Sequence, residues 1–189
     1  MPSIRTVMLA AVLAVIAPLA AAQTPTKAPV TFYGVTFPAE IAGAASISVR
    51  DYEQTSPGLG YSVGYRRGDQ VMTVYIYSKG QRTIPDDPQA PVVKAEFEKS
   101  KGEISGSGLY KSVDGMGDWT IEDAKGRTRF ACAAYVLLRN DGPVPRDSFL
   151  CLGAVKNNFF KFRITGDQRA GSEAAASDFV RAWTKVLWP

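Results

Sequence analysis

Two neighbouring stretches of the chain alternate apolar and polar residues with a period of two, which is typical of β-strands. They cover residues 60–67 and 70–78, and only Gly68 and Asp69 separate them. A two-residue loop that starts with Gly favours a type II′ hairpin, and such a turn fixes the register of both strands. In this register one face of the hairpin is entirely apolar. It pairs Tyr65 with Met72, Val63 with Val74 and Tyr61 with Ile76.

The second half of the chain predicts a four-stranded meander, with strands at residues 119–123, 128–139, 147–156 and 159–165. Two-residue turns are expected at Lys125-Gly126 and at Asn157-Asn158, where Asn tolerates positive φ. Both faces of this meander are apolar, so each needs a covering layer. The turns predict these opposed pairs: Ile121 with Phe130, Trp119 with Cys132, Val155 with Phe160, Gly153 with Phe162, Cys151 with Ile164, and Arg163 with Leu152.

Two helices are expected to supply the cover. The first is predicted at residues 91–104, because Pro91 suits a first helical turn and an approximate apolar stripe follows. The second is predicted at residues 172–187, with Ser172 as its N-cap. Its expected apolar stripe consists of Phe179, Trp183, Val186 and Leu187.

These elements together predict an α+β domain. Residues 30–38 are expected to form a short edge strand and residues 45–53 another strand, whereas the Gly- and Ser-rich residues 106–118 are expected to be irregular. The predicted architecture is a mostly antiparallel sheet of about six to seven strands flanked by helices, with the C-terminal helix packed on the sheet.

The start of the chain has the three-part pattern of a secretory signal peptide. A short basic stretch precedes an apolar run, and Ala20-Ala21-Ala22 supplies the small residues before a cleavage site. We therefore expect a signal peptide at residues 1–22, a flexible leader at 23–29, and one domain at 30–189. The exported chain would be periplasmic or secreted, and no later apolar run is long enough to span a membrane after cleavage.

Composition removes several classes of site. The chain contains no His, which excludes Ser-His-Asp and Cys-His catalysis and every metal site that needs an imidazole. Its two cysteines cannot complete a thiolate metal site, and no acidic set has the spacing of an EF-hand. We expect no metal and no cofactor. The basic residues are scattered, so nucleic acid is not an expected partner.

Cys132 and Cys151 are expected to form a disulfide. An exported chain reaches an oxidising compartment, and directly opposed residues of adjacent antiparallel strands lie within bridging distance. The alternative is a pair of buried free thiols. Three close acidic sets are expected in turns or on the surface: Asp86-Asp87, Asp114 with Asp118, and Glu122-Asp123, with Glu122 opposite Arg129 as an ordinary cross-strand pair.

Five residues are candidates for ligand binding. Lys161 and Arg163 lie on an otherwise apolar face of the last predicted strand, where a cation must snorkel, pair with an acid or bind an anion. Tyr75 and Tyr77 face small residues of the neighbouring strand and share their face with Arg66, an arrangement that favours either a shallow groove or helix packing.

Three stretches of the chain resemble a group of small exported bacterial proteins of uncharacterised function. They cover residues 57–65, 73–77 and 160–165, the last followed by the terminal helix. The order of strands and helices is also similar to that of PsbP-like domains, which have an antiparallel sheet between helices. This resemblance implies an accessory or binding module rather than an enzyme, and it assigns a function to no residue of this chain.

We therefore expect an exported, non-catalytic binding or accessory module of the cell envelope, whose partner is a small ligand or an envelope protein. One alternative is a His-free enzyme that uses carboxylate, Tyr or Lys groups. The other is an envelope structural protein that associates with itself through an uncovered part of the sheet.

Overall fold

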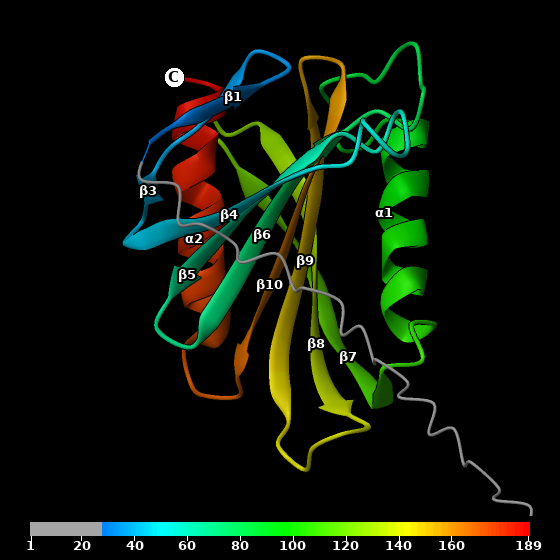
Figure 1. Ribbon diagram of the computed structural model, residues 1–189, viewed down its shortest axis with the longest axis vertical. Helices are drawn as coiled ribbons and strands as arrows, with labels where there is room; N and C mark the ends of the chain where they lie inside the picture. Colours follow the sequence, from blue (N-terminus) through cyan, green and yellow to red (C-terminus); the bar gives the residue numbers. More distant parts are fainter. Residues whose placement is uncertain (1–27) are drawn as a thin grey trace, which may run out of the picture.

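The computed structural model describes residues 28–189, which form an antiparallel sheet between two helices (Figure 1). The eight strands of the main sheet follow the order β3-β4-β5-β6-β10-β9-β8-β7, and a separate two-stranded sheet joins β1 to β2. The predicted α+β architecture, including a C-terminal helix packed on the sheet, is confirmed. The predicted signal peptide and residues 23–27 of the predicted leader lie outside the described residues.

The elements have the following bounds. The strands are β1 (Val30–Phe32), β2 (Val35–Phe37), β3 (Glu40–Ile41), β4 (Ala44–Asp51), β5 (Tyr61–Arg67), β6 (Gln70–Tyr77), β7 (Tyr110–Glu122), β8 (Thr128–Arg139), β9 (Arg146–Val155) and β10 (Asn158–Asp167). The helices are α1 (Pro91–Ser105) and α2 (Ser172–Leu187). Neither described helix is long and apolar enough to cross a bilayer.

Helix α2 covers one face of the sheet and forms the larger core with it. Trp183 is fully buried at its centre, with its ring centroid 5.3 Å from that of Phe160 and 5.2 Å from that of Phe37. Along β5, β6, β9 and β10, residues that face α2 alternate with residues on the opposite face of the sheet, as the sequence pattern predicts. This core includes Val63, Tyr65, Met72, Val74, Ile76, Phe130, Phe149, Phe162, Ile164, Phe179 and Val180.

Helix α1 covers only part of the opposite face, over β7 and β9 (Figure 1). Its buried Val93, Phe97 and Ile104 pack against the second apolar set of the meander. Pro91 stands in the first helical turn, as predicted. Strands β4, β5 and β6 extend beyond the helix on this face, and that uncovered margin positions the candidate site.

Several predicted registers are confirmed. Val63 lies opposite Val74 and Tyr65 opposite Met72 in the β5–β6 hairpin. In the meander, Trp119 lies opposite Cys132, and Cys132 lies opposite Cys151. The predicted disulfide between Cys132 and Cys151 is present.

The turn between β9 and β10 lies one residue earlier than predicted, so the predicted pairs across it were wrong. Lys156 and Asn157 take positive φ angles of 49° and 62°, and Asn158 opens β10. The Asn157 side chain explains this placement, because its Oδ1 accepts from the backbone N–H of Ile84 at 2.7 Å. The register moves by two residues, which preserves both faces. The observed pairs are Asn158 with Val155, Phe160 with Gly153, Phe162 with Cys151, Ile164 with Phe149, and Arg163 with Leu150.

The edges of the sheet differ most from the sequence expectations. The segment expected as one edge strand is the β1–β2 hairpin, because Tyr33 and Gly34 take positive φ and turn the chain. The segment expected to be irregular is the first half of β7. As an edge strand, β7 pairs only with β8, and one of its three register shifts lies at the glycines, between Gly115 and Gly117.

Two details of helix α2 also differ. Gly171 occupies the N-cap position in a left-handed conformation, and the Ser172 hydroxyl donates to the carbonyl of Arg169 instead of capping the helix. Val186 is exposed, whereas Val180 is fully buried, because the helix turns its 176–180–183 stripe toward the sheet.

The predicted cross-strand pair of Glu122 with Arg129 is absent. The register shift after Ile121 places Glu122 opposite Thr128 instead.

Candidate functional site

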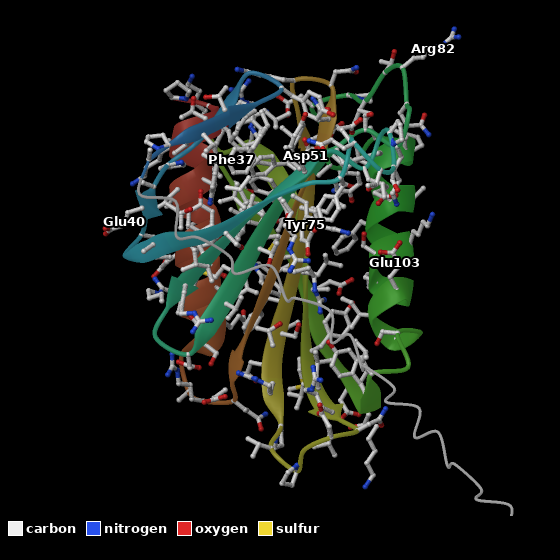
Figure 2. All side chains as sticks on the ribbon, viewed as in Figure 1. Phe37, Glu40, Asp51, Tyr75, Arg82 and Glu103 are labelled. Carbon is white, nitrogen blue, oxygen red and sulfur yellow. A yellow bond between two sulfur atoms is a disulfide. The ribbon has the colours of Figure 1, made fainter. Side chains whose placement is uncertain are left out.

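The candidate site lies where the cover of α1 ends over strands β6 and β10. Figure 2 shows Tyr75 on β6 and Glu103 on α1 on either side of this space. On this face of the sheet Lys161 lies opposite Tyr75, and Arg163 lies opposite Thr73. Two pockets adjoin here, since both are lined by Glu103 and Lys161. We call the two together the α1 groove.

The larger of these, which we call the tyrosine pocket, has a volume of about 290 Å³. Its wall combines aromatic rings with two ammonium groups and one carboxylate. The lining residues are Tyr52, Leu59, Tyr75, Tyr77, Lys79, Glu103 and Lys161.

Lys161 lies between the two pockets and is mostly buried. Its Nζ lies 5.2 Å from the ring centroid of Tyr75 and 5.3 Å from that of Tyr77, within the range of cation–π attraction. Its nearest carboxylate oxygen is Glu103 Oε2, at 3.9 Å. Burial lowers the pKa of Lys161, and the negative charges of Glu103 and Glu96 oppose this effect.

A hydrogen-bonded cluster forms one side of the tyrosine pocket. Glu96 Oε1 accepts from the Tyr77 hydroxyl at 2.8 Å and from Lys79 Nζ at 2.6 Å. Burial and the adjacent Glu96 charge raise the pKa of Tyr77, so its phenol stays protonated. The Lys79 charge is thereby already matched by Glu96.

The smaller pocket, which we call the arginine pocket, has a volume of about 160 Å³. Arg163 lies in its wall, and its Nη1 is buried without a hydrogen-bond partner in residues 28–189. Burial lowers the pKa of Arg163, while the neighbouring Tyr110 and Tyr75 hydroxyls favour its charged form. The lining residues are Ser100, Glu103, Ile104, Ser107, Tyr110, Leu150, Lys161 and Arg163.

The loop that carries Leu59 into the tyrosine pocket is held by a carboxylate. Glu53 accepts from the backbone N–H of Gly58 at 3.0 Å and from that of Gly60 at 2.6 Å. These hydrogen bonds, that of Gly58 first, and one from the Tyr33 hydroxyl lower the pKa of Glu53. The loop is also fixed to the end of β6, because the Lys79 N–H donates to the Gly58 carbonyl at 2.7 Å.

Replacing Gly60 by Ala should destabilise the protein and deform this wall of the groove. Gly60 has a φ of 64°, and a Cβ there would lie 1.9 Å from the Ile76 carbonyl oxygen. We expect a loss of ~2–4 kcal/mol in the free energy of unfolding, from backbone strain together with overpacking. Urea unfolding measures it. Gly68→Ala is the matched control, since Gly68 has a φ of 59° but open space at its Cβ, and it should lose only ~1 kcal/mol.

The structure brings four of the five predicted ligand residues together. Tyr75, Tyr77, Lys161 and Arg163 line the α1 groove, because the pairing of β6 with β10 joins the two faces that the period-two pattern had selected separately. Arg66 lies opposite Val71 further along β5, is exposed, and lines neither pocket.

Several groove residues were not among the predicted ones. Tyr52 was expected at the end of the strand predicted over residues 45–53, but β4 ends at Asp51, so Tyr52 and Leu59 both belong to the loop before β5. Glu103 follows Glu96 by seven residues, so both lie on the same face of α1, and this spacing was a usable signal. Within residues 28–189, no three His, Cys, Asp or Glu side chains are arranged to hold a metal ion.

No protein-family model and no curated protein sequence matches the chain. Among solved structures, the chain is similar to the solution structure of cyanobacterial PsbP (CyanoP) from Synechocystis sp. PCC 6803. The TM-score is 0.48 at 15% identity, and the alignment covers 91% of this chain and 96% of that one. It is also similar to the Ran-binding protein Mog1p of Saccharomyces cerevisiae, with a TM-score of 0.40, 11% identity, and coverage of 87% and 89%. The strands and helices of this chain follow the predicted order of strands, helix, four strands and helix.

Proposed function

We propose that this chain is an exported, non-catalytic binding module of the cell envelope, and that the α1 groove binds its ligand through an anionic group. The observation that carries the proposal is the Arg163 guanidinium, whose Nη1 is buried in the wall of the groove without a partner. An arginine stays charged under all ordinary conditions, so burying its donor without an acceptor costs free energy.

The charges around Arg163 support an anionic partner. The neighbours that favour its charged form are Tyr110, Tyr75 and Tyr135, of which Tyr110 also acts through its hydroxyl oxygen as a hydrogen-bond acceptor, and none of the three is a carboxylate. In the described part of the chain no ion pair joins Arg163 to an acid, while the adjacent Lys161 meets Glu103 only at 3.9 Å. An anion in the groove would therefore restore the interaction that Arg163 loses on burial.

Export is supported by two observations. The first 22 residues have the signal-peptide pattern, and the disulfide between Cys132 and Cys151 suits an oxidising compartment. We therefore propose that the protein works in the periplasm or outside the cell, where a groove of this kind would meet small ligands or envelope proteins.

Native mass spectrometry tests this proposal on the full chain exported to a bacterial periplasm and purified gently. We expect a reproducible adduct that is released on denaturation, and its mass identifies the ligand. Arg163→Met should lose the adduct, whereas Arg181→Met, on the exposed side of α2, should keep it. An adduct that persists in Arg163→Met would place the ligand elsewhere and contradict the proposed site. A bare oligomer would favour self-association instead.

A His-free enzyme is a second candidate, and Lys161 is the observation that favours it. Burial lowers the pKa of this amine beside two tyrosines, which is the environment that makes a lysine a better nucleophile. An activity that disappears in Lys161→Met but survives in Lys79→Met would replace the binding-module proposal.

The mass-spectrometry sample also tests export. After denaturation, the mass of the chain shows whether it has been cleaved after Ala22.

A further inference from the structure

We infer that the ligand of the α1 groove is a small apolar monocarboxylate, with its carboxylate at Arg163 and its apolar body in the tyrosine pocket. This inference rests on the proposed function and adds the chemical class of the ligand. It follows from three properties of the groove: its charge balance, the division of its wall into two chemically different parts, and its size.

The charge balance favours a single negative charge. The titratable cations that line the two pockets are Lys79, Lys161 and Arg163, and the lining acid is Glu103. Lys79 is matched by Glu96 at 2.6 Å, and Glu103 faces Lys161 at 3.9 Å. One positive charge, that of Arg163, is left without an acidic partner in the described part of the chain. A monoanion neutralises it, whereas a dianion would bring an unmatched charge close to Glu103.

The wall of the arginine pocket offers neutral donors around the guanidinium. Ser100, Ser107 and Tyr110 line it, so a carboxylate at Arg163 would also have hydroxyl groups within the same pocket. Ser100 is 2% exposed, and although its hydroxyl lies beside the Tyr77 phenol, its Oγ completes no hydrogen bond in residues 28–189. Two buried donors that line one pocket, Ser100 Oγ and Arg163 Nη1, thus lack acceptors.

The wall of the tyrosine pocket is suited to an apolar body. Leu59 and Tyr75 present apolar surface to it, and Tyr77 has its only hydroxyl committed to Glu96. Lys161 lies at the junction of the two pockets, where the Tyr75 and Tyr77 rings already attract its ammonium group. A ligand that reaches both pockets is therefore amphiphilic, with its charge at one end. Volumes of about 290 and 160 Å³ limit it to a small molecule.

The test compares three probes by NMR titration of the isotope-labelled wild-type protein: 4-phenylbutyrate, the neutral 4-phenylbutyramide, and inorganic phosphate. The first two have nearly the same shape, but the amide replaces the charged carboxylate by a neutral group with one acceptor oxygen. We expect 4-phenylbutyrate to shift the backbone amides of Tyr75, Lys161 and Arg163, and to bind at least tenfold more tightly than the amide, because a charge-assisted hydrogen bond is about twice as strong as a neutral one. Phosphate should bind more weakly than the carboxylate.

Variants of Arg163 test whether the carboxylate of the probe binds at this residue, and the comparison of probes on the wild type does not depend on them. Arg163→Met should abolish the preference for 4-phenylbutyrate over the amide, while Arg163→Lys should keep part of it by retaining the charge. Arg181→Met is the control on the other side of the sheet and should change nothing. If a variant fails to fold, the comparison of the two probes on the wild type still decides the question.

The outcomes separate the two proposals. Equal binding of the acid and the amide, or tighter binding of phosphate, overturns the monocarboxylate while the groove remains the ligand site. The absence of shifts at groove amides with all three probes overturns the monocarboxylate, and a mass-spectrometric adduct lost in Arg163→Met would still uphold the proposed function. Binding only at residues outside the groove overturns both.

Discussion

Removing the Cys132–Cys151 disulfide should lower the free energy of unfolding by ~3 kcal/mol, as expected from the chain-entropy effect of a cross-link that closes a loop of this size. The two cysteines are 19 residues apart and join β8 to β9, the two middle strands of the four-stranded meander in chain order. Both are buried in the core that α2 covers, so the bond holds the middle of the meander together. Breaking this bond increases the conformational entropy of the unfolded chain and so destabilises the folded state.

Urea unfolding of the oxidised and the fully reduced wild-type protein measures this effect, because the two samples differ only in the bond. Cys132→Ala/Cys151→Ala should lose more than reduction alone, since each substitution also leaves space at a fully buried position. A difference below 1 kcal/mol between oxidised and reduced protein would show that the meander is held by packing alone. The m-value should rise on reduction if the unfolded chain expands.

The disulfide also shows which parts of the fold the sequence determines most strongly. The loop between β8 and β9 does not fix their register, yet Cys132 and Cys151 lie directly opposite each other as expected. Both faces of these strands are apolar, so apolar alternation leaves the pairing open, and the covalent requirement selects it. A slip by one residue would move the two cysteines to opposite faces of the sheet, where they could not bond.

Local turn chemistry was less reliable because distant contacts decide between similar candidates. Asn157-Asn158 and Lys156-Asn157 are both possible two-residue turns from the sequence. The choice depends on Asn157, whose side chain bonds to the backbone of Ile84 and to the carbonyl of Arg82, 75 residues earlier. No local pattern contains that information.

Only about half of the candidate site could be predicted from the sequence, because the rest of it also depends on contacts between distant segments. The period of two placed Tyr75 on one face of the β5–β6 hairpin and Lys161 on one face of the meander, and the pairing of β6 with β10, which the sequence did not predict, makes them direct neighbours. The opposite wall comes from Glu103 on α1 and Leu59 on a loop, and their positions depend on how these elements pack on the sheet. Sequence patterns therefore identify the floor of such a groove better than its walls.

The second large effect is expected at Arg129, a buried cation that ties three segments together. Its Nε donates to Asp123 Oδ2 at 2.8 Å, and its Nη1 donates to Asp86 Oδ2 at 3.2 Å. Its guanidinium also lies 4.3 Å from the ring centroid of Trp188, whose Nε1 donates to Asp86 at 2.9 Å. The network joins the β7–β8 turn, the loop before α1 and the end of the chain.

Arg129→Met should lower the free energy of unfolding by ~3 kcal/mol, because the buried carboxylate of Asp123 loses its nearer cation and keeps only the exposed Arg127, at 3.3 Å. The control is Arg139→Met, whose ion pair with Asp141 is exposed and screened by solvent, so its loss should change the free energy of unfolding much less. Urea unfolding at pH 7 compares the two. Near-equal losses would mean that the Arg129 network is no stronger than an ordinary surface pair.

The same network predicts how stability changes with acid. Burial raises the pKa of Asp123, but hydrogen bonds from the Arg127 backbone and the Arg129 side chain outweigh it and hold this pKa well below its usual range. A carboxyl whose pKa is lower in the folded state stabilises the fold above its unfolded pKa of about 4, and this contribution is lost as the pH falls toward the folded pKa. Asp123→Asn should therefore be less stable than the wild type at pH 7, and the gap should narrow steadily below pH 4. Melting temperatures between pH 7 and pH 2 measure it, and a gap that stays constant would show that Asp123 does not titrate differently in the folded and unfolded states.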